Sequence, residues 1–149
     1  MSIEGLRNDV GELRGLRLAI QNISSGPQGL SLGFWSGKAA QIPSTLVLTT
    51  PSGRHEFSGI SDSAASGEID PVVIPLLPNA VYAVQLPLTS YRSVRPNLSV
   101  TNALAEATEL FVSFVGDKTV CDAYGYPHPN PVPCWFGELR SNVIRLSPR

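Results

Sequence analysis

Hydrophobic and polar positions alternate along most of this chain. Leu16, Leu18 and Ile20 alternate with polar or small residues, which is the pattern of a strand with one buried face. The segment 45–50 is rich in β-branched residues and ends at a Pro-Ser-Gly turn signal, so 54–57 is predicted to return as the second strand of a hairpin. Other short apolar runs predict strands at 30–34, 72–77, 81–86, 110–115 and 135–146.

The number and spacing of these strands predict the fold class. Seven to nine short strands separated by turn signals are typical of an all-β sandwich or barrel. The thirteen glycines and thirteen prolines agree with frequent chain reversals. Only the segment 102–109 has helix-forming composition, and Asn102 is the candidate residue to cap it. We therefore expect an antiparallel β-sandwich with little helix.

The first fourteen residues follow a different pattern from the rest. Their apolar side chains recur at three- and four-residue steps, at Ile3, Leu6, Val10 and Leu13. This spacing predicts a short N-terminal helix or arm at 1–14, followed by the β-sandwich domain at 15–149. The arm either packs on the domain or contacts a second subunit of a homo-oligomer, and the sequence leaves both alternatives open.

The second half of the chain resembles a known family. Val81-Tyr82 after the Pro-Leu-Leu-Pro-Asn turn, the strand at 110–115 and the closing segment Cys134 to Asn142 are similar to bacterial immunoglobulin-like sandwich domains. In that family a final hairpin carries a Trp-x-Gly-x-Leu-x-Ser-Asn pattern before the last apolar strand. The resemblance implies an immunoglobulin-like fold, and it leaves function open because this fold supports adhesion modules, inhibitors and enzyme accessory domains.

Charge and hydropathy exclude several classes of partner. The formal net charge is −1, from eleven basic and twelve acidic residues, and the basic residues form no run along the sequence. Nucleic acid is therefore not an expected partner, because phosphate contacts require a basic surface. No apolar stretch approaches the roughly 20 residues of a membrane span. As written, the chain is expected to be cytoplasmic, or exported if a signal peptide has been removed.

The two cysteines, Cys121 and Cys134, enclose a loop with four prolines and two tyrosines. Three interpretations stay open. A disulfide closes the base of the loop, which would stabilise the fold by about 3 kcal/mol in the loop-entropy model. Alternatively, both cysteines are reduced structural thiols. In the third, they bind a metal ion with His128 and Asp122, although the spacing is unlike that of structural zinc sites.

This loop is also the predicted binding surface. Proline restricts the backbone and tyrosine offers a large contact area with few rotatable bonds, so both lower the entropy lost on binding. The chain therefore suggests a non-enzymatic protein-interaction domain. The candidate binding residues are Tyr124, Tyr126, His128, Asn130, Trp135 and Phe136. Of the adjacent pair Trp135 and Phe136, alternation predicts that one is buried and the other faces outwards.

Catalytic motifs are missing from the sequence, so we expect no enzyme, no catalytic residue, no metal and no cofactor. There is no Gly-x-Ser-x-Gly, phosphate-binding or dinucleotide-binding motif, and His55 is expected to be an exposed residue beside a turn. Two alternative functions remain. One is a protease or toxin inhibitor on the same frame. The other is a carbohydrate-binding module that uses exposed aromatic side chains, with the candidates Trp35, Tyr82, Tyr91 and Trp135.

Overall fold

The fold is all-β, as the sequence predicts. The computed structural model describes residues 1–36, 39–40, 44–59, 69–93, 95, 97–116 and 132–147. Within these ranges nine strands have four or more residues and four have two; β1 among the longer ones was not expected, and the predicted strand at 135–146 is divided into β11, β12 and β13. The described residues include no helix of the length and apolar character needed to cross a membrane.

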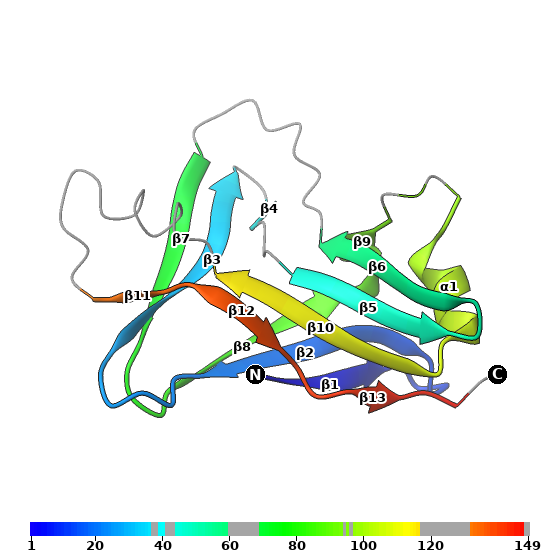
Figure 1. Cartoon of the computed structure of the whole chain (residues 1–149), viewed down its shortest axis with the longest axis horizontal. Coiled ribbons are helices and arrows are strands. Elements are labelled where there is room, and N and C mark those ends of the chain that lie inside the picture. Colours follow the sequence, from blue (N-terminus) through cyan, green and yellow to red (C-terminus); the bar gives the residue numbers. More distant parts are fainter. Residues whose placement is uncertain are drawn as a thin grey trace.

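The strands form three sheets (Figure 1). The first sheet has the order β1 (Ser2–Arg7), β2 (Leu13–Gln21) and β8 (Val81–Pro87). The second has the order β12 (Gly137–Arg140), β10 (Glu109–Gly116), β5 (Ser44–Thr50), β6 (Gly53–Gly59) and β9 (Tyr91–Arg92), with β13 (Ile144–Arg145) also paired to β10. The third contains β11 (Cys134–Trp135), β3 (Gln28–Ser36), β4 (Ala39–Ala40) and β7 (Ile69–Leu76). All described pairs are antiparallel except β11 with β3.

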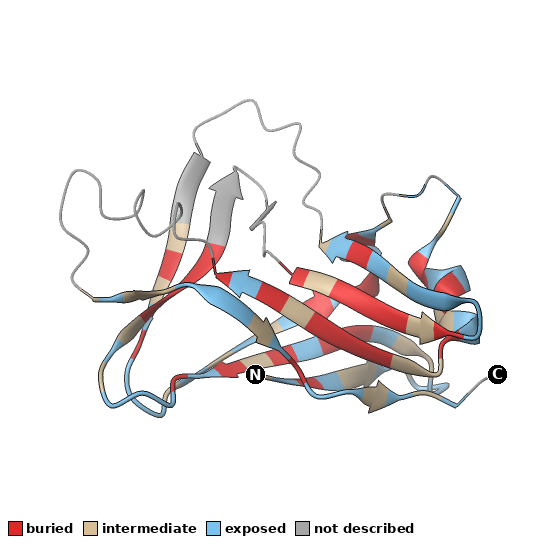
Figure 2. Ribbon diagram, in the orientation of Figure 1, coloured by how far each residue is buried: buried red, intermediate tan, exposed pale blue. Residues whose placement is uncertain are grey.

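Side chains from all three sheets meet in one apolar core. On β10, Leu110, Val112 and Phe114 are fully buried and point inwards. On β2, every second residue from Leu16 to Ile20 is buried in the same way. Figure 2 shows many buried positions along β5, β10 and β2. The two-residue period of the sequence therefore gives a sandwich-like packing of sheets around a shared interior.

The N-terminal segment is not a helix, which corrects one of the sequence predictions. Residues 2–7 form β1, which pairs with β2 from Ser2↔Ala19 to Arg7↔Leu13. The predicted boundary between an arm at 1–14 and a domain at 15–149 falls inside β2, which begins at Leu13. The turn between the two strands contains Gly11 with a φ of 78°, a conformation that glycine adopts without steric cost. A role of the N-terminus in homo-oligomers stays a prediction.

The helix is present but begins earlier than the sequence predicts. α1 spans Val100–Glu106, and its N-cap is Ser99 rather than Asn102. The hydroxyl of Ser99 accepts a hydrogen bond of 3.0 Å from the backbone N–H of Asn102. A serine three residues before the bonded N–H is the usual geometry of an N-cap. A short 3₁₀ helix, η1 (Leu88–Ser90), connects β8 to β9.

Asn22 joins two connections between the first and third sheets. Its amide nitrogen donates to the carbonyl oxygens of Gly26 and Leu76, both at 2.9 Å. Its side-chain oxygen accepts from the backbone N–H and the hydroxyl of Ser24, at 3.0 and 2.7 Å. Its backbone also bonds Asn79 and Ala80 in the turn between β7 and β8. This buried amide therefore holds the β2–β3 and β7–β8 connections together.

Ser141 and Asn142 lie in the short connection between β12 and β13. The Ser141 hydroxyl accepts from the Val112 N–H at 2.9 Å, and the Ser141 N–H donates to the Val112 carbonyl. The neighbouring Asn142 bonds β1 with both ends of its amide: its oxygen accepts from the Ile3 N–H at 2.7 Å, and its nitrogen donates to the Ile3 carbonyl at 3.2 Å. The Asn142 side chain therefore makes with Ile3 the two backbone hydrogen bonds that a paired strand would make.

Replacing Asn142 with aspartate should loosen this contact. The carboxylate has no N–H to donate to the Ile3 carbonyl and would face that carbonyl with a negative charge, so we expect a loss of about 1 kcal/mol of stability. Hydrogen exchange is the direct measurement, because the Ile3 amide should exchange faster while amides in the centre of β10 do not. An unchanged exchange rate at Ile3 would contradict the role given to Asn142.

Candidate functional site

Most of the predicted binding loop lies outside the described residues. Residues 132–147 are described, whereas 117–131 are not. The sequence-predicted residues outside the described part are Cys121, Tyr124, Tyr126, His128 and Asn130. The same holds for Asp122, so the metal-binding interpretation stays untested. The structure does describe both points at which this segment joins the sheets, Gly116 at the end of β10 and Cys134 at the start of β11.

Cys134 lies where the chain joins the third sheet. It pairs in parallel with Gly29 of β3, and the Gly29 N–H donates to the Pro133 carbonyl at 2.7 Å. Cys134 is half-buried and is not a free thiol. Its predicted disulfide partner, Cys121, lies outside the described residues, so the pairing of these two cysteines stays a prediction.

Trp135 and Phe136 point in opposite directions, as alternation predicts. The Trp135 ring packs against the core and stacks on Phe114, with ring centroids 6.4 Å apart and an interplanar angle of 23°. Phe136 is 60% exposed. A side chain at position 116 would place its Cβ 2.6 Å from the Trp135 ring, so this close approach requires glycine. Trp135 is therefore half-buried against the core, and Phe136 is the exposed member of the pair.

The other aromatic candidates differ from what a sugar-binding surface needs. Tyr91 is buried and its hydroxyl lies 3.1 Å from that of Ser44, so its assignment as an exposed sugar-stacking residue is wrong. Burial raises the pKa of Tyr91 above its usual value, against a smaller opposite effect of the Ser44 hydrogen bond. Tyr82 is half-buried against the core, and burial raises its pKa as well. The side chain of Trp35 lies outside the described residues.

His55 is less exposed than its place beside a turn suggests. The side chain is half-buried, and its Nε2 lies 3.1 Å from the Thr50 hydroxyl and 3.2 Å from the Ser52 hydroxyl. These residues come from the hairpin of β5 and β6, so the contact stays within one turn. We therefore interpret His55 as a residue that stabilises the hairpin.

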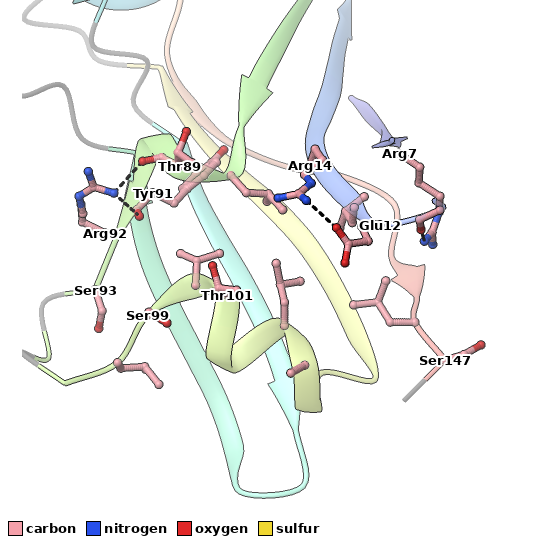
Figure 3. A pocket seen from close by; sticks show the side chains of 18 of the residues that line it. Arg7, Glu12, Arg14, Thr89, Tyr91, Arg92, Ser93, Ser99, Thr101 and Ser147 are labelled. Atoms are coloured by element: carbon pink, nitrogen blue, oxygen red, sulfur yellow. Dashed lines mark hydrogen bonds and ion pairs between the residues drawn. The ribbon is translucent and has the colours of Figure 1, made fainter. Parts of the chain in front are cut away.

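A pocket of about 970 Å³ lies at the other end of the molecule from β11 (Figures 1 and 3). Four segments contribute to it: the ends of β1 and β2 with the turn between them, η1 and β9 with the residues that follow, α1 with the residues before it, and the end of β13 with the residues after it. Its apolar floor is the edge of the core, made by Leu13, Leu88, Tyr91, Leu98, Val100, Leu104 and Leu146. The volume is within the range of small-molecule sites.

Arginine is the dominant charged residue around this pocket. Five of the nine arginines of the chain line it, against a single carboxylate, that of Glu12. The five are Arg7, Arg14, Arg92, Arg95 and Arg145. Figure 3 shows Arg92 and Arg7 on opposite sides of the hollow, with Thr101 of α1 between them at its lower boundary.

Contacts to the backbone and to Glu12 hold several of these side chains. Arg92 donates through one nitrogen to the Thr89 carbonyl at 2.7 Å, and Arg7 donates to the Gly11 carbonyl at 2.7 Å. Arg14 forms an ion pair of 2.5 Å with Glu12. A guanidinium has five N–H donors, so one bond to a carbonyl leaves others for a ligand. The pocket therefore offers several positive groups above an apolar floor.

Sequence reasoning missed this site because its arginines are far apart along the chain. A search for a run of basic residues finds nothing, since only Arg92 and Arg95 lie close together in sequence. The other three lie in β1, β2 and β13, and only the fold brings these strands together at one end of the molecule. No family model, curated protein or solved structure matches the chain.

Proposed function

We propose that this chain is a non-enzymatic protein-interaction domain on an immunoglobulin-like β-sandwich frame. The proposed contact surface is the end of the molecule where β10 ends and β11 begins, together with the Pro- and Tyr-rich segment 121–134. The exposed Phe136 beside Trp135, which is half-buried and stacked on Phe114, is the observation that carries this proposal.

Large aromatic side chains on a rigid support are the typical centres of protein interfaces. They are enriched among the residues that dominate binding energy, and a fixed backbone lowers the entropy lost on association. Phe136 follows directly on a residue that is stacked on Phe114 and paired through the backbone to β3. Its position is therefore well defined, while most of its side chain remains available to a partner.

The test compares partner capture by matched variants. Wild-type protein, Phe136→Ala, the double variant Tyr124→Ala/Tyr126→Ala and Val10→Ala are immobilised and exposed to extract from the source cells. Val10 is the control, because it is a large apolar residue that is 77% exposed in the β1–β2 turn. We expect the protein bound by wild type and by Val10→Ala to be lost by a factor of ten or more with the other two variants, as measured by quantitative mass spectrometry.

Each outcome bears on the proposal. Retention of the partner by Phe136→Ala would remove Phe136 from the interface, and retention by the double tyrosine variant would remove the loop. Equal loss with Val10→Ala would contradict the location of the surface. Thermal melting of the four proteins serves as the folding control, and the three variants are expected to melt within a few degrees of wild type because all replaced side chains are at exposed or predicted exposed positions.

A further inference from the structure

We propose that the arginine-lined pocket binds an organic anion: a carboxylate or phosphate group attached to an apolar body. This inference goes beyond the proposed protein-binding function, because the pocket lies at the opposite end of the molecule from Phe136 and shares no residue with that surface.

The charge balance of the pocket supports an anionic ligand. Five arginines line one hollow with one glutamate, Glu12, whose carboxylate is already bonded to Arg14 and to the Asn8 amide. Arg145 approaches Glu109 only to 3.9 Å and is 90% exposed, so this weak contact leaves its charge available. Like charges gathered around one hollow repel each other, and an anion bound between them would relieve the repulsion.

The geometry of the arginines suits an acidic head group. Guanidinium groups bind carboxylates and phosphates through two parallel N–H···O bonds. The Arg92 guanidinium is held at the pocket by the Thr89 and Tyr91 carbonyls, at 2.7 and 3.5 Å, so part of the entropy cost of fixing it is met before a ligand binds. Arg95, three residues further along the chain, also lines the pocket. These two residues are therefore the expected head-group contacts.

The floor of the pocket explains why the ligand should also have an apolar body. Leu88, Tyr91 and Val100 are buried members of the core that form part of the pocket wall, and Leu98 and Leu104 lie beside them half-buried. The first sheet, the second sheet and α1 leave this edge of the core open to the pocket. A ligand that covers it removes apolar surface from water, which a free inorganic anion cannot do.

The test uses decanoate and decyl phosphate as anionic probes, both below their micellar concentrations, with isothermal titration calorimetry as the measurement. Decanol is the neutral control with the same apolar body, and inorganic phosphate is the control for the head group alone. We expect saturable 1:1 binding of at least one anionic probe, at least ten-fold tighter than decanol and than inorganic phosphate. The stronger of the two anionic probes identifies the preferred head group.

Matched variants locate the binding. The double variant Arg92→Gln/Arg95→Gln should weaken binding at least ten-fold, whereas Arg17→Gln should change it less than two-fold, because Arg17 is an exposed residue of β2 that does not line the pocket. Leu104→Gln should weaken binding of the decyl probes, since it places an amide at the floor. Circular dichroism confirms that the variants are folded.

Any one of four results would overturn the proposal. The first is absence of binding by both anionic probes, and the second is equal binding of decanol. The third is unchanged affinity in the Arg92→Gln/Arg95→Gln variant, which would place the binding elsewhere. Inorganic phosphate that binds as tightly as decyl phosphate would contradict the role of the apolar floor.

Discussion

Replacing Phe114 with alanine should lower the free energy of unfolding by about 4 kcal/mol, a typical cost for truncating a fully buried aromatic side chain. Phe114 lies on the central strand β10 with no exposed surface, and it supports the Trp135 ring from the side of the core. The substitution removes apolar surface from the interior and leaves a cavity that the rigid strands on either side can fill only in part.

The comparison with Phe136→Ala makes this prediction specific. The same atoms are removed from a side chain that is mostly exposed, so the stability should change by roughly 0.5 kcal/mol or less. Urea denaturation of both variants measures the difference. Near-ultraviolet circular dichroism should also change in Phe114→Ala, because the Trp135 ring loses its stacking partner. Similar losses of stability in the two variants would mean that Phe114 is not part of a well-packed core.

Asn22→Ala should have the second-largest effect, a loss of about 3 kcal/mol. The substitution removes four side-chain hydrogen bonds at once and leaves the Leu76 carbonyl without its partner at a buried position. An unsatisfied buried polar group costs about 1–3 kcal/mol, and the loss of the other three bonds adds to this. Since the amide joins two connections between sheets, their relative position should also become less fixed.

Asn97→Ala is the matched control for this prediction. Both asparagines occupy the first position of an Asn-x-Ser sequence, but Asn97 is exposed and should tolerate alanine within about 0.5 kcal/mol. Thermal denaturation of the two variants measures the contrast. Similar melting temperatures for Asn22→Ala and Asn97→Ala would show that the amide of Asn22 does not stabilise the connections.

Alternation of apolar residues is sufficient to predict most of the strands because it reports burial on one face, which is a local property of the chain. The segment 2–7 shows the limit of this approach. Ile3 and Leu6 fit a helical spacing, whereas residues three apart lie on opposite faces of a strand, and pairing with β2 decides for the strand. That pairing is a contact with another segment, so no periodicity within the first fourteen residues contains it.

The sequence pattern also did not predict which strands pair with each other. The runs at 72–77 and 81–86 are adjacent in sequence and separated by a turn, which suggests a hairpin. In the structure β7 pairs with β3 and β8 pairs with β2, in two different sheets. Asn22 bonds both connections at this change of sheet, and a single buried asparagine gives no periodic signal in a sequence.

For the candidate sites, the sequence was informative where residues are close together and uninformative where they are not. The opposite orientations of Trp135 and Phe136 follow from adjacent positions on extended backbone, and the structure confirms them. The arginine-lined pocket depends on segments separated by more than a hundred residues. Only the fold could bring Arg7 and Arg145 to the same hollow.

The two bonds between Asn142 and Ile3 have a mechanical consequence. They connect residues that are 139 positions apart, so β1 and the segment before β13 are fastened to each other in addition to their pairing with β2 and β10. A force that pulls the termini apart would act on this connection and on the β1–β2 ladder before it reaches the core. In a single-molecule stretching experiment, β1 should therefore detach first, as a short extension that precedes the main unfolding event.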